Sequence, residues 1–266
     1  MSTTQLPPLP GDLPPVVDAR RLSGGDVGTV WLARLEDDRT VVVKRGPGDA
    51  SLEAEGLEAL RAAGAETPAV LGVDADVLVL EYVFGTGDVA ELGRRLAQVH
   101  TTRGPAFGWD RDNLIGPLAQ ANPWTDDWPT FFAEHRLDPH LDVLPRELRQ
   151  RLNAAIEDGR LARRADHEVT PSLVHGDLWG GNILHDRWLI DPAVHYADRE
   201  VDLAMLELFG AVSAQLLKGY EQVWPLDDGV DARRELLQLY PLLVHVRLFG
   251  SGYLPAVAAR LDRLGW

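Results

Sequence analysis

Cysteine is absent from the 266 residues, which excludes disulfide bonds, thiolate metal ligands and a cysteine nucleophile. Lysine and arginine are scarce: 26 of them stand against 41 acidic residues, the formal net charge is −15, and no basic run occurs. A nucleic-acid-binding protein would need the opposite balance, because phosphate contacts dominate its affinity. Any phosphate that this chain handles must be held locally, by single side chains, backbone amides or a metal ion.

Long apolar runs are also absent, so the sequence offers no segment of the length that a membrane span needs. The first residues, MSTTQLPPLPGDLPP, are rich in proline and lack the basic start and apolar stretch of a signal peptide. Together with the lack of cysteine, these features lead us to expect a soluble, cytoplasmic protein that binds neither nucleic acid nor membrane.

The first third of the chain has the pattern of a small sheet with one helix. Apolar runs over 27–35, 40–44 and 77–83 predict strands. Between the second and third run, leucines at helical spacing predict a helix over 51–63 that ends at Gly64. We expect a proline-rich segment at 1–15 and an N-terminal nucleotide-binding lobe at 16–85.

The remainder is mainly helical. Asp88 and Glu91 can form a capping box, which predicts that a helix begins after Asp88. Further helices are predicted over 146–163, 201–212, 232–249 and 255–264. Residues 103–129 lack periodicity but contain three tryptophans, which is typical of a functional loop rather than disorder. The sequence therefore predicts an α+β protein with two lobes, the second of which, 86–266, carries catalysis and substrate binding.

The stretch LVHGDLWGGNIL, residues 173–184, places Asp177 after a short apolar strand and Asn182 five residues later. Asp191 follows the next apolar pair. This spacing is typical of phosphoryl transfer, in which one carboxylate orients the attacking hydroxyl while an amide oxygen and a second carboxylate hold Mg²⁺ on the nucleotide phosphates. The structural alternative is a glycine turn in which Asp177 caps local amides. The presence of Asp177, Asn182 and Asp191 in this order favours a kinase over that alternative.

The N-terminal lobe offers the nucleotide-anchoring groups. Lys44 ends an apolar strand, from which its ammonium can reach phosphates, and Glu53 in the following helix can pair with it. Glu55 and Glu58 compete for this role but are expected to be solvated. The glycine turn containing Gly24 and Gly25 can cover phosphates, and the backbone from Glu81 to Val83 is where an adenine would bind.

Three further polar residues are expected to support the site rather than react. His175, beside Asp177, is interpreted as a structural residue that packs and orients the loop. His100 follows an apolar helix face and is expected in the core or at a cap. Asp202 begins a helix, where it can interact with the helix dipole or, on a sharper hypothesis, brace the catalytic loop.

HGDLWGGN at 175–182, DPA at 191–193 and DREVDLAM at 198–205 resemble the fructosamine kinase, or ketosamine kinase, family of the protein-kinase-like superfamily. The more diagnostic match is NPWTDDWPTFFAEHRLDPHLD at 122–142, since the HGD motif is shared with aminoglycoside and choline kinases. The resemblance extends from Gly24 to Leu264. It implies that Asp177 is the catalytic base, that Asn182 and Asp191 hold the metal, and that Lys44 and Glu53 anchor phosphates.

The resemblance also implies an ATP- and Mg²⁺-dependent kinase that phosphorylates the carbon-3 hydroxyl of a ketoamine, a step in deglycation repair. The substrate would be a small ketoamine or a glycated lysine or protein, contacted by Trp124, Asp127, Trp128 and Trp179. Trp128, with Phe131 and Phe132, could instead begin a core-facing helix. Gly180 stands where the family often has serine, which leaves the reacting groups untouched.

Two other functions share parts of this pattern. A kinase for aminoglycosides or other small amines shares the chemistry, and the 122–142 segment favours ketosamines over it. A nucleotide-binding pseudokinase would lack at least one of four side chains that are all present here: Lys44, Asp177, Asn182 and Asp191.

Overall fold

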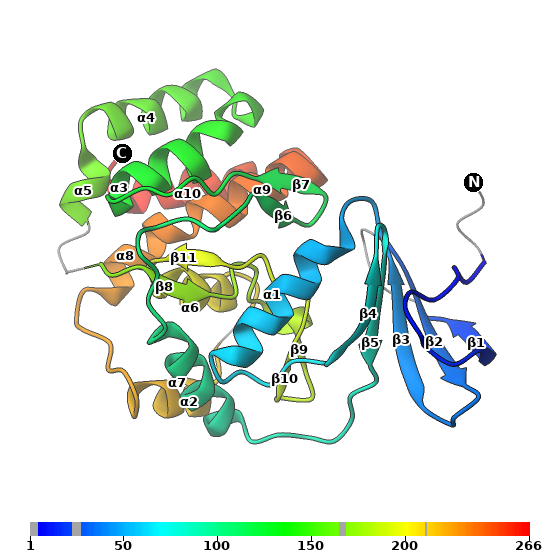
Figure 1. Ribbon diagram of the computed structural model, residues 1–266. Helices are drawn as coiled ribbons and strands as arrows, with labels where there is room; N and C mark the ends of the chain where they lie inside the picture. Colours follow the sequence, from blue (N-terminus) through cyan, green and yellow to red (C-terminus); the bar gives the residue numbers. More distant parts are fainter. Residues whose placement is uncertain (1–4, 23–27, 165–168, 211) are drawn as a thin grey trace.

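The computed structural model describes residues 5–22, 28–164, 169–210 and 212–266. Its N-terminal part is an antiparallel sheet of five strands in the order β1-β2-β3-β5-β4 (Figure 1). The strands are β1 (Val16–Arg21), β2 (Thr29–Leu35), β3 (Thr40–Arg45), β4 (Val70–Asp74) and β5 (Val77–Glu81). Strand β3 lies in the middle, so Lys44 projects from the best supported strand of the sheet, opposite Val30 and Leu78.

Helix α1 (Ala50–Ala62) is inserted between β3 and β4 and lies between the sheet and the rest of the protein (Figure 1). Asp49 caps its start by accepting a hydrogen bond from the Ser51 amide at 2.9 Å, and the chain leaves it at Gly64 with a φ of +105°. Leu57 of α1 packs against Leu78 and Leu80 on one face of the sheet.

The opposite face of the sheet is covered by the proline-rich N-terminal segment. Leu6, Leu9 and Leu13 pack against a buried cluster that includes Trp31 and Val43. The segment therefore closes the core of this lobe.

The C-terminal part is built around helices, with short strand pairs among them. The helices are α2 (Val89–His100), α3 (Trp128–Phe132), α4 (Arg146–Glu157), α5 (Arg160–Arg164), α6 (Glu200–Leu208), α7 (Ala214–Glu221), α8 (Val230–Leu237), α9 (Leu239–Phe249) and α10 (Leu254–Leu264). The strand pairs are β6 (Asn113–Ile115) with β7 (Leu118–Gln120), β8 (Ser172–Val174) with β11 (His195–Ala197), and β9 (Ile183–Leu184) with β10 (Trp188–Leu189). None of the helices in the described ranges is long and apolar enough to cross a bilayer.

Several elements differ from the sequence expectations. Strand β1 was not predicted because it is an exposed edge strand with little apolar patterning, and β4 and α7 were also missed. The single helix expected over 146–163 is divided at Gly159, which has a φ of +64°, and that over 232–249 is divided at Gln238. The helix expected over 201–212 ends at Leu208. Within 103–129, β6 and β7 form a hairpin that was not predicted, and Gly116 and Pro117 form the turn between them.

Candidate active site

The loop that follows β8 is fixed by one buried carboxylate. Asp202, on α6, accepts hydrogen bonds from the backbone amides of His175 at 2.7 Å and Gly176 at 2.9 Å. Its side chain is almost completely buried, and its Oδ2 also lies 3.1 Å from Nε2 of His100. The sharper hypothesis for Asp202, that it braces this loop, agrees with these contacts, and His100 belongs to the same brace.

Gly176 is required where the loop turns. Its φ is +83°, and a Cβ at this position would stand 2.1 Å from the carbonyl oxygen of Ala193. A side chain would therefore collide with the backbone that follows Asp191. This close approach brings the Asp177 loop and the Asp191 segment together, with a hydrogen bond from the Ala193 amide to the His175 carbonyl at 2.8 Å.

His175 is a structural histidine, as its contacts make clear. Its Nδ1 accepts from the Asp177 amide at 3.2 Å, so the neutral ring carries its proton on Nε2, which donates to the Ile190 carbonyl at 2.9 Å. Burial lowers the pKa of this ring below its usual value. The imidazole thus ties the loop to the strand that leads into Asp191.

Asp177 and Asn182 are held together across the loop. The amide nitrogen of Asn182 donates to the Asp177 carbonyl oxygen at 2.8 Å and to its Oδ2 at 3.3 Å. Burial, reinforced by the negative charge of Asp191, raises the pKa of Asp177 to about 6. A carboxyl group tuned in this way remains ionised at neutral pH and is a better proton acceptor than an exposed aspartate.

Asp191 connects this loop to the N-terminal lobe. It adopts a φ of +55°, and its Oδ1 accepts a hydrogen bond from the Lys44 ammonium, which also binds Glu53 Oε1 at 2.6 Å. Burial alone would lower the pKa of Lys44, but the two carboxylates raise it above its ordinary value. The same ammonium outweighs the effect of burial on Asp191 and holds the pKa of that carboxyl low. Lys44 is therefore charged, and it bridges the lobes.

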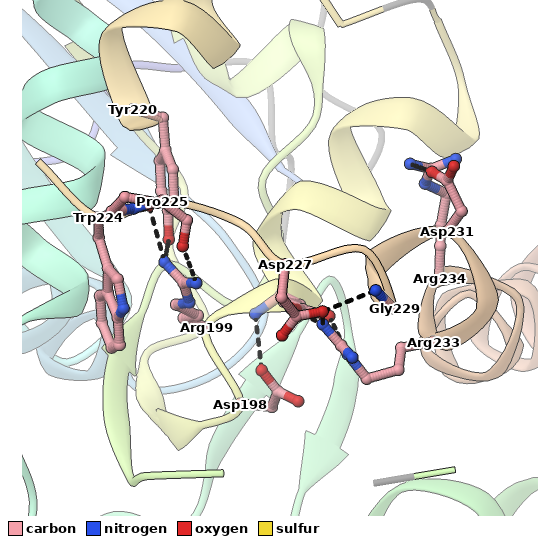
Figure 2. A network of polar contacts seen from close by, with 11 residues as sticks. Asp198, Arg199, Tyr220, Trp224, Pro225, Asp227, Gly229, Asp231, Arg233 and Arg234 are labelled. Atoms are coloured by element: carbon pink, nitrogen blue, oxygen red, sulfur yellow. Dashed lines mark hydrogen bonds and ion pairs between the residues drawn. The ribbon is translucent and has the colours of Figure 1, made fainter. Parts of the chain in front are cut away.

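A second network secures the start of α6, the helix that carries Asp202 (Figure 2). The guanidinium of Arg199 donates to the carbonyls of Trp224 at 3.0 Å and Pro225 at 2.7 Å and lies 3.9 Å from the Trp224 ring centre. The buried pair of Arg233 with Glu200, at 2.7 Å, anchors the next residue of the helix. These contacts hold the start of α6 in place and thereby stabilise the position of Asp202.

The tryptophans predicted to contact substrate divide into two groups. Trp124 and Trp179 are exposed to 42% and 41%, so each presents a ring to solvent. Trp128 is buried and packs on Phe131 and Phe132 in the core, so it offers no free ring face in this conformation. The carboxylate of Asp127 caps α3 through Thr130, at 3.0 Å to the amide and 2.6 Å to the hydroxyl, although the residue remains exposed.

Buried amides support the segment that carries these aromatic residues. Asn113 donates to the Val194 carbonyl at 2.8 Å, and both Gln120 and Asn122 donate to the Asn113 Oδ1. Arg136 donates to Asn122 Oδ1 at 2.6 Å, and burial lowers the pKa of this guanidinium to about 10. This network was not predicted from the sequence, although Asn122 and Arg136 lie within the 122–142 segment that most clearly resembles the fructosamine kinase family.

The prediction that Glu55 is solvated holds only in part, because its side chain is 34% exposed but both carboxylate oxygens are bound. Its Oε1 accepts from the indole nitrogen of Trp109 at 2.7 Å and its Oε2 from Nε of Arg111 at 2.8 Å. Glu58, one turn along α1, is exposed, as expected. The two glutamates looked alike in the sequence because the partners of Glu55 come from more than 50 residues away.

A family model for fructosamine kinase matches residues 6–265 of the chain. The chain belongs to the fructosamine kinase family. A probable ketoamine kinase of Synechocystis is 42% identical to it over an alignment of 216 positions, which covers 76% of this chain and 73% of that protein.

Solved structures confirm the predicted two-lobed, protein-kinase-like α+β fold. A proposed fructosamine-3-kinase from Thermobifida fusca superposes with a TM-score of 0.86 at 33% identity, and the match covers 94% of this chain and 93% of that protein. A choline/ethanolamine kinase family protein from Mesorhizobium loti reaches a TM-score of 0.60 at 19% identity, with 93% and 87% covered, a likeness of fold alone. Membership of the family makes the chain a kinase for which sugar amines are the expected class of substrate.

The donor groups of this kinase fit a magnesium ion. The amide nitrogen of Asn182 is engaged with Asp177, which leaves its Oδ1 as the atom available to a cation, and Asp191 adds a carboxylate. Hard oxygen donors of this kind suit Mg²⁺, which needs few protein ligands when phosphates are present. The described residues contain no cluster of three or more histidine, cysteine or acidic side chains arranged for a metal.

The described residues that are predicted to bind nucleotide lie in and after the N-terminal sheet. Gly24 and Gly25 lie outside the described residues. Glu81 ends β5; its backbone amide donates to the Ala69 carbonyl at 2.9 Å, and its side-chain Oε2 accepts from the Ala69 amide at 3.2 Å. The side chain of Val83 is buried. The part played by Glu81 and Val83 in adenine binding stays a prediction.

Proposed function

We propose that this kinase transfers the terminal phosphate of ATP to the carbon-3 hydroxyl of a small ketoamine, such as a fructosamine or a ribulosamine. One observation carries the proposal: Lys44 pairs with Glu53 and with Asp191, and this brings the phosphate-anchoring lysine beside the loop that holds Asp177 and Asn182. The family to which the chain belongs supports the substrate class.

The chain's own residues have distinct tasks in this reaction. Asp177 accepts a hydrogen bond from the attacking hydroxyl, orients it and takes its proton late, since a hydroxyl is too weak an acid to be ionised beforehand. Lys44, kept charged and in place by Glu53, binds phosphate oxygens. Asn182 and Asp191 would hold Mg²⁺, which when bound neutralises phosphate charge.

The exposed rings of Trp124 and Trp179 are proposed to hold the acceptor. Aromatic faces suit the C–H surfaces of a sugar and attract a protonated secondary amine. The exposed carboxylate of Asp127 can add an attractive charge, whereas buried Trp128 would act by supporting α3.

Purified protein with ATP and Mg²⁺ tests the proposal against a panel of ketoamines and aminoglycosides. We expect ketoamine-dependent release of ADP, and phosphorus NMR of the product should place the phosphate on carbon 3. Phosphorylation of aminoglycosides in preference to ketoamines would replace the proposed substrate. Asp177→Asn protein, purified in parallel, is the control for contaminating kinases.

The role in deglycation follows from the product and is tested separately. A ketoamine phosphorylated on carbon 3 is unstable, so the free amine should appear after the phosphate has been transferred. A product that keeps its amine through prolonged incubation would limit the proposal to phosphorylation.

A further inference from the structure

Glu55, in the N-terminal lobe, contacts the aromatic segment of the C-terminal lobe through its side chain. It belongs to α1, while its partners Trp109 and Arg111 lie in the 103–129 segment. The two carboxylate oxygens are used separately, one at 2.7 Å from the Trp109 indole nitrogen and the other at 2.8 Å from Arg111 Nε. Arg111 also donates to Ser51 at 2.9 Å, so two residues of α1 share this contact.

From Trp109, a row of rings leads to the surface. The centre of the Trp109 ring lies 5.3 Å from that of Tyr196, which in turn lies 6.0 Å from that of Trp124, stacked at 29°. Tyr196 cannot move independently of this segment, because its backbone exchanges two hydrogen bonds with Gly108, at 2.8 and 3.0 Å. Trp124 ends the row with 42% of its surface exposed.

Helix α1 also carries one member of the proposed nucleotide-anchoring pair, Glu53, whose partner Lys44 lies on β3. Glu53 lies two residues earlier in α1 and binds Lys44 at 2.6 Å. Gly56 lets α1 approach the C-terminal lobe closely, since a Cβ there would stand 2.9 Å from the ring of Pro192, next to Asp191. A helix is stiff over one turn, so a displacement of Glu55 also displaces Glu53.

We propose that Glu55 is a positioning residue that couples acceptor binding at Trp124 to phosphate anchoring at Lys44 and Glu53. A molecule stacked on Trp124 restricts the row Trp124–Tyr196–Trp109, and the Trp109–Glu55 hydrogen bond passes this restriction to α1. The acceptor and the nucleotide then strengthen each other's binding, as linkage requires of coupled sites. The identity of the acceptor rests on the proposed function; the contact with α1 does not.

Titration of a non-hydrolysable ATP analogue with Mg²⁺, in the absence and presence of fructosyl-lysine, tests the coupling. In the wild type we expect the ketoamine to tighten analogue binding about fivefold or more, the usual range for coupled sites. In Glu55→Ala and Trp109→Phe the ratio should fall toward one. Trp109→Phe is informative because it keeps an aromatic ring against Tyr196 and removes only the donor to Glu55.

Glu58→Ala is the matched control, because Glu58 is exposed on the same helix and should leave the ratio unchanged. A wild type that binds both molecules without coupling, or variants that keep the wild-type ratio, would overturn the proposal. A loss of fold in Glu55→Ala is recognised by analogue binding that disappears even without the ketoamine; Trp109→Phe, which leaves Glu55 and its contact with Arg111 in place, is then the milder variant and should still bring the ratio toward one.

Hydrogen exchange of the α1 amides in the analogue-bound protein separates this proposal from the proposed function. Exchange should be faster in Glu55→Ala and Trp109→Phe than in the wild type and Glu58→Ala. If fructosyl-lysine fails to bind but exchange changes in this way, the substrate is wrong and the contact stands. Exchange that is equal in all four proteins would remove Glu55 as a positioning residue.

Discussion

The loop at 175–182, which carries the proposed catalytic residues, and the aromatic segment at 103–129 both adjoin strand β8, yet they are held in different ways. Two backbone amides of the loop bind one buried carboxylate, Asp202. The segment is held both by backbone hydrogen bonds, such as those between Gly108 and Tyr196, and by side-chain amides, such as Asn113, which bind carbonyls about 80 residues away. The loop is thus a short rigid unit that fixes reacting groups, whereas the segment is shaped by many distant contacts. Changes in the loop should lower kcat, and changes in the segment should mainly raise KM.

Asp191→Ala should have the largest effect. It removes a proposed metal ligand and one partner of Lys44, and turnover should fall by about 10³-fold or more, since metal stabilisation is worth several kcal/mol. Steady-state kinetics at saturating Mg²⁺ measures the loss, and circular dichroism checks the fold. Undiminished activity, or activity that survives excess chelator, would remove the metal assignment.

Asp177→Asn should lower kcat by about 10²- to 10⁴-fold and leave ATP affinity almost unchanged. The amide keeps the shape of the carboxylate but cannot accept the proton. Kinetics with a ketoamine, measured beside nucleotide titration, provide the test. Equal turnover would contradict the base assignment, and a parallel loss of ATP affinity would make Asp177 a metal ligand.

Lys44→Ala should lower kcat/KM for ATP by roughly 10²-fold, because it leaves two carboxylates facing each other without their shared cation. The loss should exceed that in Glu55→Ala, since Glu55 touches neither carboxylate directly. Initial rates at varied ATP concentration compare the two variants with Glu58→Ala. A Glu55 variant more impaired than the Lys44 variant would reverse the roles of the two contacts.

The activity should fall in acid. The pKa of Asp177 is raised from 3.8 to about 6, first by burial and then by Asp191, and only the ionised form is a base. Hence kcat/KM should fall about tenfold per unit below pH 6 as Asp177 becomes protonated. The pH profile with a ketoamine measures this, and a profile that stays level to pH 5 would contradict a raised pKa.

The same shift has an opposite consequence for stability. Between the two pKa values the folded state binds more protons than the unfolded state, so the folded protein gains stability as pH falls, and ionised Asp177 destabilises it at neutral pH. Asp177→Asn should therefore raise the free energy of unfolding at pH 7.5, by on the order of 1 kcal/mol. Urea unfolding measures the gain, with exposed Asp126→Asn as the control.

Trp124→Ala should have the smallest effect, raising KM for the ketoamine by about 3- to 10-fold at nearly constant kcat, as expected for an exposed aromatic contact. Trp124→Phe should recover most of the affinity. A large fall in kcat instead would show that the aromatic segment takes part in aligning the reacting groups and would weaken the contrast with the catalytic loop.

The sequence by itself determined the residues whose task depends on near neighbours. The order Asp177, Asn182, Asp191 predicts the proposed phosphoryl-transfer site because a tight glycine turn closes over a few residues, and the cap at Asp88 is formed with Glu91 three residues on. Only the tertiary structure decided that Glu53 binds Lys44 while Glu55 binds Trp109, that Trp128 is buried while Trp124 is exposed, and that Asp202 holds the catalytic loop. Such choices depend on which distant segment packs against a side chain, and periodicity within a helix carries no record of that partner.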